Sequence, residues 1–236
     1  MTQIDPRQIG AILFDKDGTL FDFGATWNAW AKTFLMRIAD DDPHRAGVLG
    51  HIIGFDLAAG VFAPDSFVIA GTPDELVETL APECPHLSKD RLFAMINEEA
   101  AAAPMVEAVP LAPLLERLSA AGIRLGVATN DAEAPAFAHL DAAGVRRCFD
   151  FIAGSDSGYG AKPEPGQLLA FCSAVGIDPG RTLMVGDSTH DLIAGRAAGM
   201  GTVAVLTGMA STSDLAPFAD LVLPDIGHLP AWLGLA

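Results

Sequence analysis

The chain has 236 residues, and its 30 acidic residues outnumber the 14 lysines and arginines, which gives a formal net charge of −16. This excess of negative charge disfavours nucleic acid and anionic membrane surfaces as partners. No apolar run reaches the roughly 18 residues that span a bilayer, and the N-terminal stretch lacks the basic start and apolar segment of a signal peptide. We therefore expect a cytoplasmic protein, and one with a sizeable core because half of its residues are hydrophobic.

The first predicted strand is the apolar run at residues 9–14 (IGAILF), which leads directly into a polar turn. In the second half of the chain, similar runs alternate with helical patterns. The runs are IRLGVAT, FDFIAG, TLMVG, VAVLT (203–207) and LVLP (221–224), and the helices are 132–143, 164–175 and 189–198. Such alternation is typical of right-handed βαβ units. The sequence therefore predicts an α/β fold with a Rossmann-like, doubly wound parallel sheet.

The region from residue 22 to residue 103 differs, because it is almost all helical pattern. Trp27, Trp30 and Phe34 recur with helical spacing, Thr72 opens a capping box, and Ser88 begins a further helix. An insertion of this length is expected to fold as its own subdomain. Ligands of open α/β sheets bind at the carboxyl ends of the strands, so an insertion that leaves just after the first strand is expected to cover the site as a lid.

The first polar cluster, Asp15-Lys16-Asp17-Gly18, directly follows the first predicted strand. Two carboxylates two residues apart on an extended chain point the same way, so one can attack while the other handles a proton. Gly18 permits a sharp turn and close approach to a ligand. The same letters occur in calcium loops and surface turns, but the apolar strand just before them argues against that reading. Lys16 is expected to point outward and to take no part in catalysis.

Two weaker signals follow later strands. Thr129 and Asn130 come directly after a strand, where a hydroxyl and backbone N–H groups can hold a phosphate oxygen, although Thr-Asn-Asp by itself is an ordinary helix start. Lys162 precedes a helix in KPEP, where it can neutralise a phosphate together with an attacking carboxylate. Alone it is typical of an exposed lysine before a proline-started helix, and only the other clusters give it a function.

The last cluster, Gly186-Asp187-Ser188-Thr189-His190-Asp191, lies at a strand-to-helix junction. Two acids four residues apart can hold a hard divalent cation there. Helix capping explains one of the two acids but not both as easily. His190 is expected at the rim of the site or on the helix surface.

Together, DKDGTL, VATN, KPEP and GDSTHD resemble, in order, the four motifs of the haloacid dehalogenase superfamily. The helical insertion after the first motif resembles its helical-cap subgroup, and the nearest resemblance is to the phosphoglycolate phosphatase-like branch. The resemblance covers the chain from about residue 9 to its end. It implies a core of residues 1–21 and 104–236 and a helical cap subdomain at residues 22–103.

This resemblance implies a phosphatase that forms an aspartyl-phosphate intermediate. Asp15 is implied to attack phosphorus, and Asp17 to protonate the leaving oxygen and then to activate water. Thr129 is implied to bind the transferring phosphate, and Lys162 to stabilise its charge. The residues implied to bind substrate are Gly18, Thr129, Asn130 and Lys162.

The implied cofactor is Mg²⁺, which would offset the repulsion between a carboxylate nucleophile and an anionic phosphate. Asp187 is implied to ligate it together with Asp15, and Asp17 to reach it through the backbone carbonyl. Asp191 is implied to join the ligands or to support the water shell of the metal.

Three alternatives stay open at this point. A phosphomutase would use the same aspartates but return the phosphoryl group to a sugar. A metal-free haloacid dehalogenase is disfavoured by Asp17, because that branch lacks this acid. A non-catalytic protein of the same fold is disfavoured because every catalytic residue implied by the resemblance is present.

The expected substrate is a small phosphate monoester, because a closed lid leaves little room for a macromolecule and no basic patch offsets the net charge. Phosphoglycolate or a sugar phosphate is implied by the resemblance. Arg37, Arg45 and Arg91 of the cap are candidates for binding a second anionic group, although each alone is more typical of a solvated face. A monomer and a homodimer are both compatible with the sequence.

Overall fold

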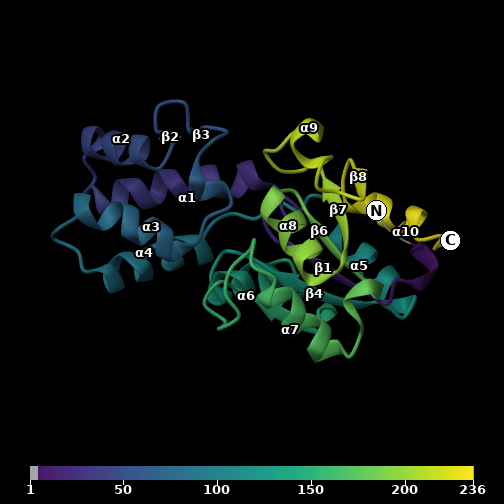
Figure 1. Ribbon diagram of the computed structural model, residues 1–236. Helices are drawn as coiled ribbons and strands as arrows, with labels where there is room; N and C mark the ends of the chain where they lie inside the picture. The colour runs from purple at the N-terminus through teal and green to yellow at the C-terminus, as the bar shows by residue number, and fades with distance from the viewer. Residues whose placement is uncertain (1–4, 236) are drawn as a thin grey trace.

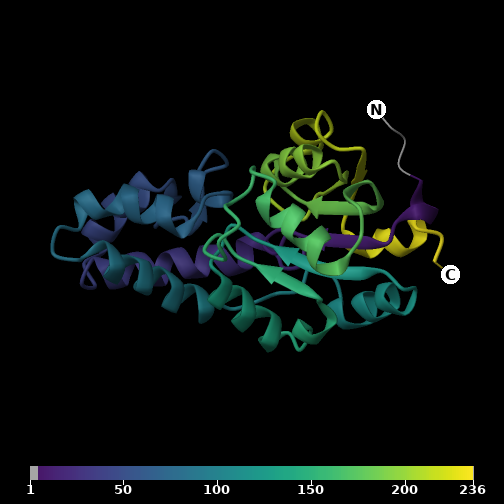
Figure 2. The same ribbon diagram turned by 60° about the horizontal axis from the view of Figure 1, so that its bottom comes forward.

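The computed structural model describes residues 5–235 and contains a six-stranded sheet (Figures 1 and 2). Its strands are parallel and lie in the order β5-β4-β1-β6-β7-β8. They are β1 (Ala11–Phe14), β4 (Arg124–Ala128), β5 (Phe151–Ala153), β6 (Thr182–Gly186), β7 (Gly201–Val205) and β8 (Leu221–Leu223). The predicted α/β sheet is confirmed, although β7 begins and ends two residues earlier than expected. Because β1 lies between β4 and β6, the residue after β1 emerges near the middle of the carboxyl edge.

Helices cover both faces of the sheet, because strand side chains alternate between the faces. Ile12 and Phe14 of β1 belong to one core, to which α5 (Leu111–Ala120), α6 (Glu133–Ala142) and α10 (Leu229–Trp232) contribute. Ala11 and Leu13 belong to the opposite core, with α7 (Gly166–Val175) and α8 (Thr189–Ala198). A short helix, α9 (Thr212–Leu215), packs beside α8. Single 3₁₀ turns occur at Pro6–Gln8, Phe67–Ile69, Ala81–Glu83, Arg146–Cys148, Pro179–Arg181 and Ile226–His228.

The insertion forms a helical cap with its own hydrophobic core, beside the sheet in Figure 1. Its helices are α1 (Phe23–Ile38), α2 (Pro43–Ile52), α3 (Pro73–Leu80) and α4 (Lys89–Ala101). The expected capping box at Thr72 and the helix start at Ser88 are confirmed. The expectation of an almost wholly helical insertion was wrong at one place, the antiparallel hairpin of β2 (Phe55–Asp56) and β3 (Val61–Phe62). Gly54 and Gly60, both at positive φ, end α2 and turn the hairpin.

The two connections between cap and sheet lie side by side. The backbone N–H of Asp22 donates to the carbonyl of Val106 at 2.8 Å, and that of Ala108 donates to the carbonyl of Leu20 at 2.9 Å. This paired linker begins a few residues after β1, so the cap is attached next to the carboxyl edge of the sheet. Within residues 5–235, no helix combines the length and apolar character needed to cross a membrane.

Candidate active site at the carboxyl edge of the sheet

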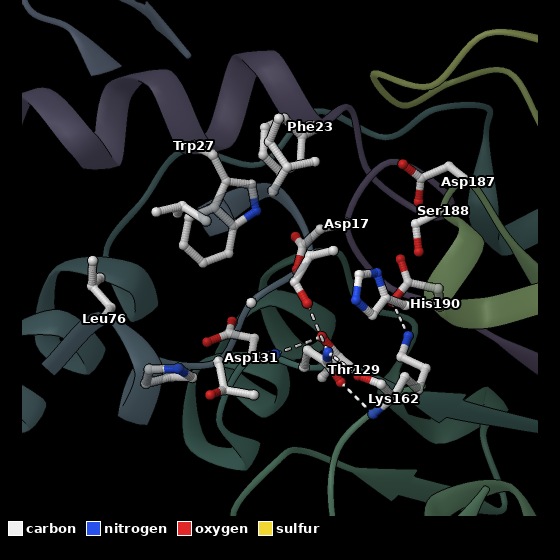
Figure 3. Close-up of a pocket in the computed structure, with 18 of the residues that line it drawn as sticks. Asp17, Phe23, Trp27, Leu76, Thr129, Asp131, Lys162, Asp187, Ser188 and His190 are labelled. Atoms are coloured by element: carbon white, nitrogen blue, oxygen red, sulfur yellow. Dashed lines mark hydrogen bonds and ion pairs between the residues drawn. The ribbon is translucent and has the colours of Figure 1, made fainter. Parts of the chain in front are cut away.

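Four segments that are far apart in the sequence meet in one pocket between sheet and cap (Figure 3). Asp15 follows β1, Thr129 follows β4 and Asp187 follows β6, while Lys162 comes from the loop between β5 and α7. All four side chains are buried and line the pocket. Asp17, Asn130 and Asp191 also line it. The carboxyl ends of parallel strands meet at one edge, and this is why the motif residues gather there.

Lys162 occupies the centre of the charged residues. Its Nζ donates to Oδ1 of Asp15 and Oδ1 of Asp191, both at 2.6 Å, and to the carbonyl of Ala128 at 2.7 Å. Burial alone would lower the pKa of Lys162, but the two carboxylates raise it. A permanent ammonium group therefore lies against Asp15, where it can offset the charge of an approaching phosphate.

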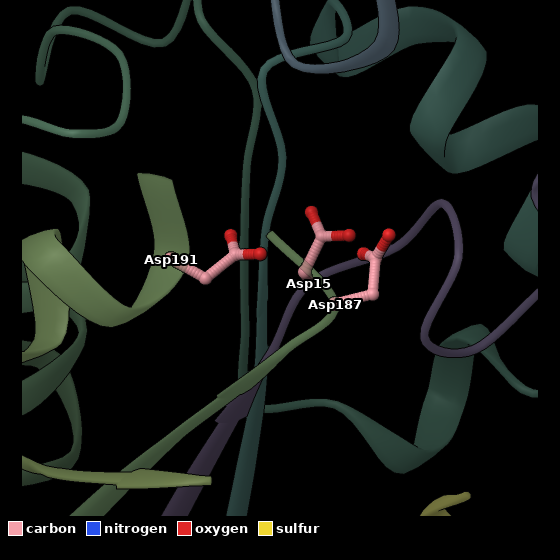
Figure 4. Close-up of side chains that lie close together, drawn as sticks. All are labelled: Asp15, Asp187 and Asp191. Atoms are coloured by element: carbon pink, nitrogen blue, oxygen red, sulfur yellow. The ribbon is translucent and has the colours of Figure 1, made fainter. Parts of the chain in front are cut away.

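Asp15, Asp187 and Asp191 form a buried trio of carboxylates whose nearest oxygens lie within 4.8 Å of one another (Figure 4). Burial raises the pKa of Asp15 to about 7. The Lys162 ammonium lowers this pKa and the charge of Asp191 raises it, but burial has the largest effect. Burial also raises the pKa of Asp187 well above its usual range. Repulsion within a set of hard oxygen donors is relieved by a divalent cation, so this trio fits a magnesium ion.

The side chain of Asp17 is not part of that trio. It is held by Lys16, whose Nζ lies 2.8 Å from Oδ2 of Asp17. The implied contact between the Asp17 backbone carbonyl and a metal stays a prediction.

Two glycines leave the space that the Asp187 carboxylate occupies. Gly18 has φ +81°, and a Cβ built there would collide with the side chain of Asp187. A Cβ on Gly208 would collide with the same carboxylate. The hydroxyl of Thr207 donates to the carbonyl of Gly18 at 2.6 Å and fixes this turn. Gly18 thus permits the close approach of Asp187, and its expected close approach to a ligand stays a prediction.

Asn130 fixes the backbone of Lys162. Its Oδ1 accepts from the N–H of Lys162, and its Nδ2 donates to the carbonyl of Lys162, both at 2.8 Å. The same Nδ2 donates to the carbonyl of Ala70 in the cap at 2.8 Å. Gln167, buried and unnoticed in the sequence, donates to the carbonyl of Thr129 at 3.1 Å and holds that loop. Direct contact of Thr129 and Asn130 with substrate stays a prediction.

The expectation that Lys16 points outward was wrong. Its side chain is fully buried, and its Nζ lies 2.8 Å from Oδ2 of Asp17, 3.0 Å from Oδ2 of Asp131 and 2.9 Å from Nδ1 of His139. Strand alternation does not reach Lys16, because β1 ends two residues earlier, and Trp27 of the cap covers the ammonium at 5.6 Å from its ring centroid. Burial alone would lower the pKa of Lys16, but Asp17 and Asp131 raise it.

His139 extends this buried cluster to the cap. An ammonium group can only donate, so Nδ1 of His139 accepts from Lys16 and its Nε2–H donates to the carbonyl of Ala100 in α4 at 2.7 Å. A proton on Nδ1 would face the Lys16 ammonium in a buried site. Burial, followed by the charge of Lys16, lowers the pKa of His139 from 6.5 to about 4.

We expect this histidine to make the protein less stable in acid. The unfolded chain takes up the proton near pH 6.5 and the folded protein only near pH 4. The neutral imidazole therefore contributes about 3 kcal/mol to the free energy of unfolding above pH 6.5. This contribution is lost as the pH falls to about 4. Urea unfolding at pH 7.5 and pH 4.5 measures it. His139→Gln keeps an acceptor and a donor but cannot titrate, so equal pH dependence in variant and wild type would contradict the assignment.

Three comparisons place this chain among known proteins. The sequence profile of haloacid dehalogenase-like hydrolases matches residues 9–199. The chain is 31% identical to a phosphoglycolate phosphatase of Rhodospirillum rubrum over 229 residues, 95% of this chain and 90% of that one. It is 29% identical to an N-acetylmuramic acid 6-phosphate phosphatase of Pseudomonas aeruginosa, over 88% and 86% of the two chains. CbbY from Rhodobacter sphaeroides, solved in complex with phosphate, matches with a TM-score of 0.71 at 21% identity, over 94% and 96%.

The fold and the charged pocket define a hydrolase whose site lies under a helical cap. The chain belongs to the haloacid dehalogenase-like hydrolases, because the profile covers most of its length and a relative above 30% identity aligns over nearly all of it. Within that family it is an enzyme of the phosphatase type. The resemblance seen in the four sequence motifs is thereby confirmed.

Proposed function

We propose that this enzyme hydrolyses a small phosphate monoester, phosphoglycolate or a sugar phosphate, with Asp15 as the nucleophile and Mg²⁺ as the cofactor. The observation that carries the proposal is the position of Asp15, buried at the end of β1 with the ammonium of Lys162 at 2.6 Å and two further carboxylates beside it. The relatives are named as phosphatases of phosphoglycolate and of N-acetylmuramic acid 6-phosphate, which supports both substrate classes.

In the first half-reaction, a carboxylate oxygen of Asp15 attacks phosphorus. A bond from that oxygen to phosphorus forms while the bond from phosphorus to the ester oxygen breaks. Asp17 gives its proton to the departing oxygen, which leaves as an alcohol. Lys162 offsets the negative charge, and the Thr129 hydroxyl donates to a phosphoryl oxygen. Phosphoryl transfer depends mainly on such positioning and charge neutralisation.

In the second half-reaction, water attacks phosphorus of the aspartyl-phosphate. Asp17 takes the proton from the water, the bond from Asp15 to phosphorus breaks, and inorganic phosphate leaves. Asp15 is then a carboxylate again and Asp17 is protonated, ready for the next ester. A carboxylate nucleophile thus divides one slow displacement into two steps.

The residues that would hold magnesium are Asp15, Asp187 and Asp191, with the backbone carbonyl of Asp17 as a fourth oxygen. A magnesium ion supplies positive charge to the phosphoryl oxygens and orients the ester against the nucleophile. We also propose that residues 22–103 move as a unit on the paired linker at Asp22 and Val106, opening to admit substrate and closing to exclude water.

We expect EDTA to abolish phosphate release and added Mg²⁺ to restore it, with Ca²⁺ a poor substitute because its coordination is larger and looser. Protons compete with the metal for Asp15, whose pKa is about 7. Below pH 7 the apparent Mg²⁺ affinity should therefore fall by up to about tenfold per pH unit. Magnesium titrations of phosphate release at pH 6, 7 and 8 measure this.

Full activity in EDTA, or a magnesium affinity that does not change between pH 6 and pH 8, would contradict this metal site. The same assay separates hydrolase from mutase, because a mutase converts a sugar phosphate into its isomer without net release of phosphate. Inorganic phosphate released in proportion to ester consumed is the expected result.

A further inference from the structure

On the basis of the proposed function, we propose that the preferred esters have an uncharged leaving group with a flat, largely apolar face, such as a sugar or an aromatic ring. Trp27 of the cap is its main contact. Phosphoglycolate, whose leaving group carries a carboxylate, is then a poor substrate. This narrows the substrate class beyond what the catalytic residues define.

The cap side of the pocket is aromatic and aliphatic (Figure 3). It is formed mainly by Phe23, Trp27, Trp30, Val68, Ile69 and Leu76. Trp30 donates its Nε1–H to the carbonyl of Ile96 at 3.2 Å, whereas the Nε1–H of Trp27 has no acceptor among the described residues. A leaving group therefore meets an apolar wall, and the N–H groups of both tryptophans are closed to it.

The positive charges of the cap lie outside this wall. Arg37 is paired with Glu98 and Glu99, both at 2.6 Å, and Arg91 is paired with Glu98 at 3.1 Å. Neither these two nor Arg45 is among the residues that line the pocket. The three arginines that the sequence suggested for binding a second anionic group therefore do not line the pocket.

On the core side, Lys162 and His190 are the basic side chains among the described residues that line the pocket. All three ammonium hydrogens of Lys162 have acceptors, in Asp15, Asp191 and the carbonyl of Ala128. His190 belongs to the core side and to the neighbouring hollow, so the cap wall itself offers no basic side chain. A substrate carboxylate buried against that wall would lose its hydration without a cation beside it, which is costly.

The surface beside the pocket adds a second, independent argument. A hollow beside the pocket shares seven lining residues with it: Ile69, Ala70, Gly71, Thr72, Lys162, Ser188 and His190. Four exposed acids line this hollow: Asp65, Glu75, Glu164 and Asp214. Glu75 and Asp214 also take part in capping boxes, but their partners there are neutral groups, so the negative charge of both acids is not cancelled. An ester with additional negative charge is repelled by these acids when it approaches this side of the pocket.

A cationic leaving group gains little from the Trp27 ring. The Lys16 ammonium lies 5.6 Å from the Trp27 ring centroid, so the ring already has a cation partner. A neutral ring is not repelled by the acids of the hollow and needs no cation–π contact with Trp27.

The test compares kcat/KM in magnesium for phosphoglycolate, a hexose 6-phosphate, phenyl phosphate and acetyl phosphate. We expect at least one of the two ring esters to exceed phosphoglycolate by about tenfold or more, the size of discrimination that a pocket of this kind provides. Trp27→Leu should lower the ratio of kcat/KM for that ester to kcat/KM for acetyl phosphate by about tenfold. The hexose and phenyl esters show which kind of ring is preferred.

A converse variant places a cation in the wall. Val68→Lys should raise kcat/KM for phosphoglycolate several-fold, whereas Val48→Lys, the same change at an exposed position of α2 outside the pocket, should not. Preference of the wild type for phosphoglycolate, or an unchanged ratio in Trp27→Leu, would overturn the inference and leave the proposed function standing. Failure to hydrolyse any ester, acetyl phosphate included, would overturn both.

Discussion

Asp15→Asn is expected to lower kcat/KM by on the order of 10⁴-fold or more, because an amide oxygen cannot replace the attacking carboxylate. The fold should survive the change. Asparagine has nearly the same shape, and the pKa of Asp15 near 7 shows that burial already disfavours its charge. Lys162 keeps Asp191 and the carbonyl of Ala128 as acceptors. Phosphate release measures activity, and circular dichroism with urea unfolding measures the fold.

The matched control for this change is Asp141→Asn. Asp141 lies on α6 and is not among the residues that line the pocket. Its exposed carboxylate is paired with Arg146 at 2.9 Å. It should keep full activity. Mass spectrometry of the wild type, quenched in acid during turnover, should find a phosphoryl group on the peptide that contains Asp15. A phosphoryl adduct on another residue, or near-normal turnover by Asp15→Asn, would overturn the assignment.

The position of the site was predictable because it follows from strand topology. Asp15, Thr129 and Asp187 each follow an apolar strand, and parallel strands bring their carboxyl ends to one edge. The sequence therefore predicted that these residues would meet. Lys162 was a weak signal alone, because a lysine before a proline-started helix has no local feature that marks it as buried. Only the presence of the other motifs predicted that Lys162 would join the pocket, where it lies beside Asp15.

The buried cluster around Lys16 was not predictable in the same way. Lys16 and His139 are 123 residues apart and come from a loop and a helix whose packing no local pattern encodes. Alternation along a strand gave the wrong direction for Lys16, because the strand had already ended. Gln167 was missed for a related reason, because its hydrogen bonds are made to segments distant in sequence. The hairpin at residues 55–62 was missed because it depends on two glycine turns.

The largest effect on stability is expected from Lys16→Met. The change leaves Asp131, which is buried, and Asp17, which is partly buried, without the ammonium that both contact, and it removes the donor to Nδ1 of His139. Breaking a buried ion pair from one side costs about 3–5 kcal/mol, so the free energy of unfolding in urea should fall by that amount at pH 7.5. Lys32→Met, at an exposed position of α1, is the control and should change stability little.

A second substitution separates the loss of charge pairing from the loss of packing. If unpaired carboxylates cause the destabilisation, Asp131→Asn should recover part of it in the Lys16→Met background, yet destabilise the wild type, where it removes an ion pair to Lys16. Asp131→Asn should therefore raise the free energy of unfolding in the Lys16→Met background and lower it in the wild type. In a double-mutant cycle, such opposite effects show that the two residues are energetically coupled. Purely additive effects would mean that Lys16 and Asp131 do not stabilise the folded protein through their ion pair. In Lys16→Met, kcat should also fall, because Asp17 loses the ammonium that orients it beside the nucleophile.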